Sequence, residues 1–406
     1  MNKNFTLLLA GQLVSQVGDK FHMIALSFWV LETTGSSGKM GMVLAASLVP
    51  SLIMGFFSGT FIDRYSRKTI IVGTDLIRGL VLGCFTLLFI TGRMDFYLIL
   101  TLQMILSVNA AFFDPAIPSV IPQIVDRKQL ARANGLAQFV SGFSLVGGAM
   151  LGGMVVAGAG YVWVFFLNAV SFLVSAVFES FIVIPPVSVP IQVEQKNSLI
   201  SDMKQGYGYL FENQHLMVLL FMVMVIHFFV GSIEVFMPVI ADRIAADGPR
   251  TLGFFQAAFG SGTIVMAVVI GMGLGNGLNK EKLALFASTF FIGALFGGSF
   301  FVSSFMRGSL IPMKEGFILC LFSMGCALIL ASVSFKTLLQ KNMDNRYAGR
   351  IFALTGSLGN AAIPGAMILY GFLLDRFDFP GLLLFTGLLL MLTSLISFIL
   401  YKEKRG

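Results

Sequence analysis

The sequence predicts an all-α membrane protein in which twelve transmembrane helices form two six-helix bundles. Of its 406 residues 56% are hydrophobic and only 12% are charged, and the mean hydropathy is +0.88. A soluble domain averages about 25% charged residues, so a chain this apolar requires lipid as its solvent. The apolar runs are long and continuous rather than alternating, which favours helices over a β-barrel.

Each predicted helix corresponds to one apolar run. A bilayer core about 30 Å thick requires roughly 20 apolar residues per helix. The chain contains twelve runs of this kind, at residues 5–31, 40–62, 69–91, 96–118, 133–158, 161–184, 216–240, 251–275, 283–305, 309–334, 346–374 and 379–401. We expect the first run to stay in the mature chain, because it is too long and too uncharged at its start for a cleaved signal peptide.

The longest polar stretch divides the runs six and six. We expect an N-terminal bundle over residues 1–184, a linker over 185–215 and a C-terminal bundle over 216–406. The halves repeat short motifs at a nearly constant offset: Val17-Gly18-Asp19 matches Val230-Gly231-Ser232, and Gly148-Ala149-Met150 matches Gly365-Ala366-Met367. Parallel six-helix repeats place a substrate cavity at the interface between halves.

The basic residues predict the orientation. Lysine and arginine gather in both tails and in the loops after the even-numbered runs. By the positive-inside rule this places both termini in the cytoplasm. The net charge of +7 therefore reflects topology, and we expect no nucleic-acid partner.

The loop between the second and third runs carries the most specific motif. From Gly59 to Lys68 it reads Gly-Thr-Phe-Ile-Asp-Arg-Tyr-Ser-Arg-Lys. The form G-x-x-x-D-R-x-x-R-K resembles the signature loop of the major facilitator superfamily, the largest class of secondary transporters. In this interpretation Asp63 lies against the positive N-terminal end of the eleventh helix, near Asn345 and Arg346. The candidate gating residues are Gly59, Asp63, Arg64, Arg67, Lys68 and, as their partner on the fourth helix, Asp114. The alternative is a loop whose charges only hold it in the cytoplasm.

Further motifs resemble one branch of this superfamily. The pattern from Gln12 to Asp19, the sequence Phe113-Asp114-Pro115-Ala116 and the segment from Ala348 to Ser357 are similar to bacterial macrolide-efflux and siderophore exporters. Lysophospholipid transporters share some of these motifs. Two features depart from drug/proton antiporters, since residues 104–109 contain no arginine and Ala149 stands where a proline is usual.

Ionisable residues inside a membrane are costly, which makes them candidates for function. Gln12, Gln16 and Asp19 are spaced i, i+4 and i+7 and so share one helix face. We expect this face to line the cavity; the alternative is helix packing or an ion pair between Asp19 and Lys20.

The seventh run repeats this situation. Glu234 is a candidate proton carrier, and His227 lies two turns before it on the same face. The alternatives are a solvated Glu234 and a packing histidine.

Three other sets of charges have structural interpretations beside functional ones. Lys314 and Glu315 are either substrate contacts or, for the lysine, a side chain that snorkels to the interface. Asp75 and Arg78 are i, i+3 and are expected to pair with each other. Glu179 is expected to be a solvated boundary residue.

The sequence favours an exporter of amphipathic organic compounds in the bacterial cytoplasmic membrane, with protons as the coupling ion. The 42 phenylalanines and 22 methionines leave little room for the polar contacts that sugars need. A lysolipid transporter is the second hypothesis, and a receptor or membrane enzyme the third. We expect no enzymatic activity, cofactor or metal site, because no phosphate-binding loop, metal-ligand cluster or catalytic spacing is present.

Overall fold

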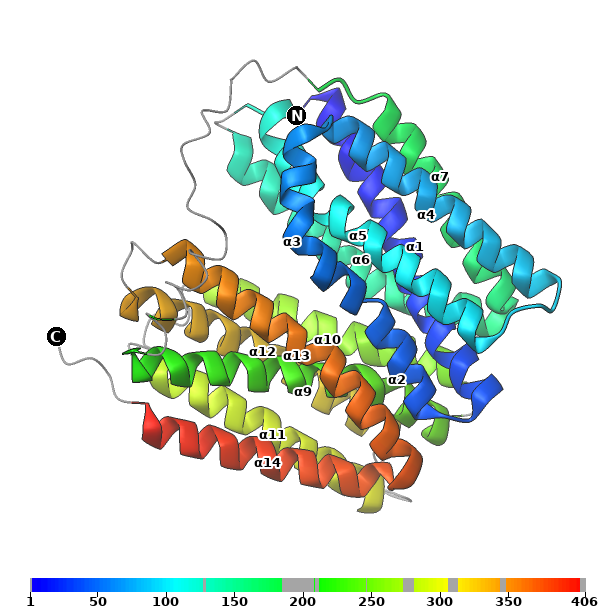
Figure 1. The fold of residues 1–406 in the computed structure, drawn as a ribbon. Coiled ribbons are helices and arrows are strands. Elements are labelled where there is room, and N and C mark those ends of the chain that lie inside the picture. The colour runs from blue at the N-terminus through cyan, green and yellow to red at the C-terminus, as the bar shows by residue number, and fades with distance from the viewer. Residues whose placement is uncertain are drawn as a thin grey trace. The chain divides into compact units, whose positions relative to one another are not determined.

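The computed structural model describes residues 2–126, 129–184, 208, 212–245, 247–272, 281–305, 313–343 and 348–401. Within these residues the regular elements are α-helices (Figure 1). They are α1 (Lys3–Thr34), α2 (Ser37–Ala46), α3 (Val49–Arg64), α4 (Arg67–Ile90), α5 (Phe96–Ile124), α6 (Leu130–Ala159), α7 (Tyr161–Ser180), α9 (Gln214–Ile244), α10 (Gly248–Gly271), α11 (Glu281–Phe305), α12 (Met313–Asn342), α13 (Ala348–Arg376) and α14 (Phe379–Leu400).

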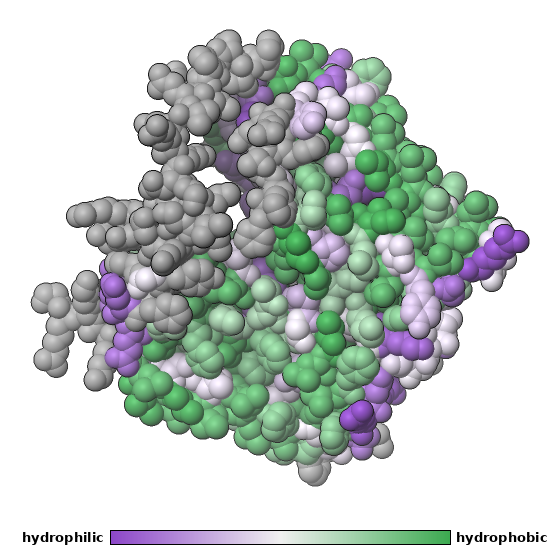
Figure 2. Space-filling view, viewed as in Figure 1, coloured by the Kyte–Doolittle hydropathy of each residue, from purple (hydrophilic) through white to green (hydrophobic). Residues whose placement is uncertain are grey.

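Within the described residues, each of the twelve predicted runs is confirmed as mainly helical. Eleven described helical stretches are long and apolar enough to cross a membrane. The remaining long helix is α1, with 32 residues. Figure 2 shows broad apolar surfaces on the viewed face, as lipid contact requires. The chain is therefore a multi-pass membrane protein.

The second predicted run is interrupted in the structure. It consists of α2 and α3, which are separated at Ser47 and Leu48. Pro50 explains the position of the break, because a proline ring clashes with the carbonyl group four residues earlier. That residue is Ala46, where α2 ends.

The fourth helix is longer than predicted. We expected an end near residue 118, yet α5 continues to Ile124 with Pro115, Pro118 and Pro122 inside it. All three prolines lie on the exposed side of the helix. Their spacing of three and four residues keeps the missing N–H groups on one face, so the opposite face packs without interruption.

The chain forms two compact units. The first comprises Met1–Val187 and Val235–Ala257, and the second comprises Ser188–Glu234 and Ala258–Gly406. In the first unit, α1 packs against α6 and α7, and α4 packs against α5 and α7. The tip of the α9–α10 hairpin also belongs to this unit: Gly248 lies against Phe28, and Gly253 against Ala149.

The start of α1 is fixed to the ends of two other helices. The Asn2 side chain accepts a hydrogen bond from Phe5 N at 3.0 Å, which caps α1, and donates one to Ile124 O. Asn4 and Val183 exchange two hydrogen bonds. Beneath them lies a buried apolar core from α1, α4, α5 and α6, which includes Phe5, Leu8, Ile71, Phe113 and Val120. Three of these helices, α1, α4 and α5, also contribute to the polar cluster described below.

The second unit relies on close helix contacts through glycine. Gly262 on α10 leaves no room for a Cβ atom beside Phe322 O of α12, and Gly325 on α12 leaves none beside Phe259 O of α10. Small residues let membrane helices approach closely and gain van der Waals contact.

Candidate functional site

A group of ionisable and amide side chains lies inside the first unit, between helices that otherwise present apolar residues. We call Asp19, Asp75, Arg78, Asn109 and Glu179 the Arg78 cluster. They come from α1, α4, α5 and α7, and Figure 1 shows α4 running alongside α7. Arg78 is the cation to which Asp19, Asp75 and Glu179 are all electrostatically coupled.

Arg78 is buried, with 7% of its surface exposed. Its Nε donates a hydrogen bond of 2.9 Å to Asn109 Oδ1 on α5. Its guanidinium carbon lies 4.6 Å from the ring centre of Phe113 and 5.2 Å from that of Phe172. An amide and two aromatic faces therefore hold the cation in an otherwise apolar interior.

The carboxyl groups of Asp75 and Glu179 have no comparable hydrogen bond. Asp75 and Glu179 are both 0% exposed. Among the residues that the structure describes, none forms a hydrogen bond to any of their four carboxyl oxygens. The interpretation of Glu179 as a solvated boundary residue was wrong, because the packing of α4 against α7 encloses it. The expected pairing of Asp75 with Arg78 is also not observed, because no ion pair within 4 Å joins them among the described residues and Arg78 Nε bonds to Asn109.

Asp19 adjoins the cluster from α1. It is half-buried, and its polar and charged neighbours are Asn168 on α7, Arg78 and Lys20. Gly18 makes this position possible, because a Cβ atom there would collide with Asn168 and Ser171 of α7. On the same helix Gln12 is buried and Gln16 is half-buried, so only part of the predicted polar face is accessible.

His22 continues the polar row on α1 but is a packing histidine. It is 3% exposed, and its Nε2 forms a hydrogen bond of 2.9 Å with Gln103 Oε1 of α5. The rings of Phe85 and Phe165 lie edge-on at 5.2 Å from it.

The candidates of the C-terminal half lie in the second unit. Glu234 and His227 are both half-buried on α9. His227 Nδ1 donates a hydrogen bond of 2.8 Å to Val223 O of its own helix. Lys314 is half-buried and Glu315 exposed, and both occupy the first turn of α12 rather than its middle.

The gating candidates are only partly described. Gly59, Asp63 and Arg64 belong to the last turns of α3, but their side chains, like Asn345 and Arg346, lie outside the described residues. Arg67 and Lys68 begin α4 and are half-buried. Asp114 is exposed on α5, where its charged neighbours are Arg78 and Asp19.

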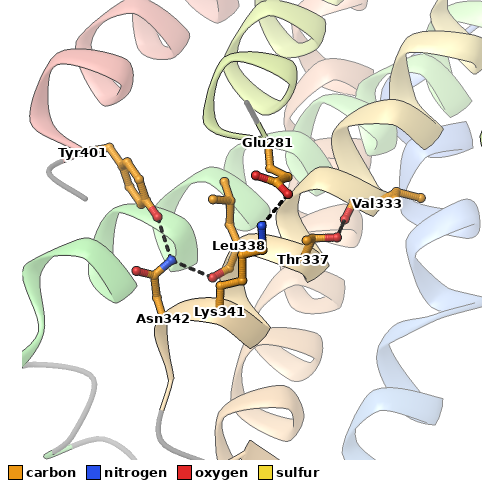
Figure 3. A network of polar contacts seen from close by, with 7 residues as sticks. All are labelled: Glu281, Val333, Thr337, Leu338, Lys341, Asn342 and Tyr401. Carbon is orange, nitrogen blue, oxygen red and sulfur yellow. Dashed lines mark hydrogen bonds and ion pairs between the residues drawn. The ribbon is translucent and has the colours of Figure 1, made fainter. Parts of the chain in front are cut away.

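A second polar group joins three helix ends in the second unit (Figure 3). Lys341 Nζ, at the end of α12, contacts Glu281 Oε1, at the start of α11, at 2.6 Å. Asn342 donates a hydrogen bond of 3.0 Å to the hydroxyl group of Tyr401, which caps α14. Lys282 donates one of 2.9 Å to Tyr401 O. These contacts fix the ends of α11, α12 and α14 to one another.

Our sequence reasoning gave no role to three amides that organise the first unit. Gln103, Asn109 and Asn168 are buried and support His22, Arg78 and Asp19, respectively. Gln103 and Asn109 are the two amides of the fourth apolar run, and Asn168 is the single amide of the sixth. That rarity was the available signal, because a buried amide requires a polar partner.

The sequence is similar to known efflux proteins over nearly its full length. Macrolide efflux protein A of Streptococcus pyogenes is 25% identical over 401 residues, which cover 97% of this chain and 94% of that protein. Macrolide efflux protein A of Enterococcus faecalis is 25% identical over 332 residues, covering 80% of this chain and 98% of the relative.

The fold is shared with solved transporter structures of low sequence identity. The nucleoside transporter NupG superposes with a TM-score of 0.78 at 12% identity, covering 100% of both chains. An inward-facing bacterial homologue of the iron transporter ferroportin superposes with a TM-score of 0.67 at 16% identity, covering 98% of this chain and 97% of that one. A sequence profile of the Major Facilitator Superfamily matches residues 8–367. By the long apolar helices of its described residues, its signature loop and this match, the chain belongs to the Major Facilitator Superfamily and is a transporter rather than an enzyme.

Proposed function

We propose that this transporter exports amphipathic organic compounds, of the macrolide or siderophore kind, from the bacterial cytoplasm by alternating access coupled to protons. The observation that carries the proposal is the near-complete coverage of both this chain and a macrolide efflux protein. The composition agrees with it, because a chain rich in phenylalanine and methionine offers apolar contacts rather than the hydrogen bonds that sugars require.

Proton coupling supplies the energy in this proposal. One proton crossing a potential of 100 mV releases about 2.3 kcal/mol. Asp19, with Gln12 and Gln16 on its helix, and Glu234, with His227, are the candidates for contact with substrate or protons. Lys314 and Glu315 are the candidates for substrate contact on the outer side of the cavity.

The gating proposal assigns the signature loop to the closure of the cytoplasmic side. Asp63 is the group that contacts a helix N-terminus, with Gly59, Arg64, Arg67 and Lys68 supporting it and Asp114 on the neighbouring helix. In this arrangement both termini are cytoplasmic, as the distribution of lysine and arginine predicts.

We expect the purified protein in proteoliposomes to move a macrolide against its gradient when a pH gradient is imposed. Asp63→Asn should reduce this transport at least tenfold without preventing folding, because it removes a charge from a helix terminus rather than from the core. Asp126→Asn is the matched control, since Asp126 is an exposed aspartate in the loop after α5. Wild-type rates in Asp63→Asn would reject the gate, and gradient-independent transport by the wild type would reject proton coupling.

A lysolipid transporter is the second candidate, and one structural feature favours it. A groove of about 630 Å³ lies between α3, α4 and α5 and is almost entirely apolar. Its walls include Tyr65, Ile77, Met104, Ile105 and Phe112. Thermal unfolding of the purified protein in the presence of lysophospholipids and of macrolides distinguishes the candidates, because only a bound ligand raises the unfolding temperature.

A further inference from the structure

The buried carboxyl groups of Asp75 and Glu179 require an explanation that the proposed transport path does not give. Both side chains are fully enclosed where α4 packs against α7. None of their four oxygens forms a hydrogen bond among the described residues, and the neighbouring polar group on α7 is the hydroxyl of Ser175, beside Asp75. An ionised carboxylate in such surroundings loses its hydration without replacement, at a cost of several kcal/mol.

The charged groups around this pair come from four helices. Asp19 and Lys20 come from α1, Arg78 from α4, Asp114 from α5, and Glu179 faces Asp75 from α7. Within the described part of the first unit, no ion pair shorter than 4 Å joins any of these groups. Four carboxyl groups thus share two cations, and neither cation contacts Asp75 or Glu179 directly. A neighbouring like charge disfavours ionisation, so this arrangement favours neutral carboxyl groups.

We propose that Asp75 and Glu179 form the proton-binding site of this transporter, and that Arg78 is its exchangeable counter-charge. In the state seen here Arg78 is bonded to Asn109 and both carboxyl groups hold protons. When a proton leaves Asp75, the carboxylate attracts Arg78, which lies one turn further along α4. The ion pair between Asp75 and Arg78 that the sequence suggests therefore forms in the deprotonated state. The hydrogen bond between Arg78 and Asn109 forms in the protonated state.

The balance of this step involves protons only. A carboxylate takes up one proton to become a carboxylic acid and releases it again, with no change of any other bond. Asn109 connects the step to ligand binding, because it also lines the apolar groove between α3, α4 and α5. A ligand polar group that takes up the Asn109 oxygen releases Arg78 toward Asp75. The role of this site in transport rests on the proposed proton coupling, whereas proton binding by Asp75 and Glu179 does not depend on it.

Infrared spectroscopy of the purified protein tests the site without any substrate. A protonated carboxyl group gives a C=O stretching band that shifts on exchange into heavy water. We expect wild-type protein at neutral pH to show this band, and Asp75→Asn and Glu179→Gln each to remove part of it. Asp126→Asn and Glu212→Gln, at exposed positions, are the matched controls and should leave the band unchanged. Absence of the band in wild type, or its survival in both Asp75→Asn and Glu179→Gln, overturns the proposal.

Three further measurements separate a functional site from a structural one. Asparagine and glutamine resemble the protonated acids, so both variants should unfold at the wild-type temperature. Loss of a carboxylate that was ionised and paired with Arg78 would instead lower that temperature, because the buried cation would lose its partner. Arg78→Met should keep the band up to a more alkaline pH than wild type, because it removes the counter-charge. Arg78→Lys should restore most of the wild-type profile, and an unchanged profile in Arg78→Met overturns the role of Arg78.

Transport distinguishes this inference from the proposed function. In proteoliposomes, Asp75→Asn and Glu179→Gln should lose gradient-driven movement at least tenfold and keep exchange of substrate across the membrane. Loss of gradient response in Glu234→Gln alone would place coupling in the second unit and overturn this assignment. If the infrared bands behave as expected but wild-type transport ignores the pH gradient, the proton site stands and proton-coupled export is rejected.

Discussion

Gly262→Ala is expected to destabilise the second unit by roughly 2–3 kcal/mol, although it adds only one methyl group. A Cβ atom at Gly262 collides with the backbone oxygen of Phe322 on α12. Because that oxygen is part of a helix, the two helices must move apart as rigid elements. The contact is reciprocal, since Gly325 on α12 faces Phe259 O of α10 in the same way. We therefore expect Gly325→Ala to have a similar effect.

The measurement is the temperature at which the purified protein unfolds in detergent. Gly297→Ala on α11 is the matched control, because a Cβ atom at Gly297 meets nothing within 4 Å. That substitution should be neutral or slightly stabilising, since alanine favours the helix over glycine. Equal unfolding temperatures for Gly262→Ala and Gly297→Ala would contradict the close contact between α10 and α12.

Tyr401→Ala is expected to lower the stability of the second unit by about 3 kcal/mol, the range seen when a buried aromatic residue is truncated. Tyr401 is 1% exposed although it follows the last helix of the chain. Its ring centre lies 5.9 Å from that of Phe286, and Lys282 Nζ lies 5.4 Å from it. Truncation leaves a cavity and also removes the anchor between α11, α12 and α14.

Two milder variants separate the contributions at this site. Tyr401→Phe removes only the hydroxyl group that accepts the hydrogen bond from Asn342, and should cost about 1 kcal/mol. Glu281→Gln removes the nearby ion pair with Lys341. Because the side chains of Glu281 and Lys341 are 25% and 59% exposed, respectively, this change should cost less than about 1 kcal/mol. The unfolding temperature should therefore fall in the order Glu281→Gln, Tyr401→Phe, Tyr401→Ala. A loss in Tyr401→Phe as large as in Tyr401→Ala would show that the hydroxyl group, not the packing of the ring, holds the helix ends together.

The helices were predictable from the sequence because the bilayer sets their length and polarity. Runs of about 20 apolar residues have one solution in lipid, a helix that satisfies its own backbone. The predicted helix boundaries were less accurate near proline residues. Pro50 breaks the second run, because its ring clashes within the helix, whereas the three prolines of α5 are tolerated on its exposed side.

Only some of the buried polar residues could be predicted from the sequence. Asp19, Asp75 and Arg78 are conspicuous as charges in apolar runs, and Gly18 belongs to a motif that was recognised without its reason. The structure gives the reason, since α7 approaches Gly18 too closely for any side chain there. The roles of Asn109 and Asn168 were not predicted, because an uncharged amide in an apolar run is a weaker signal than a charged residue.

The partners of Arg78 were decided by tertiary structure alone. Sequence spacing along α4 favours Asp75, which is three residues away. The hydrogen bond goes instead to Asn109, which is 31 residues away in sequence. The same holds for Glu179, whose place near the end of α7 indicates solvent but whose contact with α4 excludes it. The sequence by itself determined which segments enter the membrane, because that depends on the composition of each segment. Only the packing of α1, α4, α5 and α7 decided which charges are paired, buried or left without a donor, because that depends on which helix faces meet.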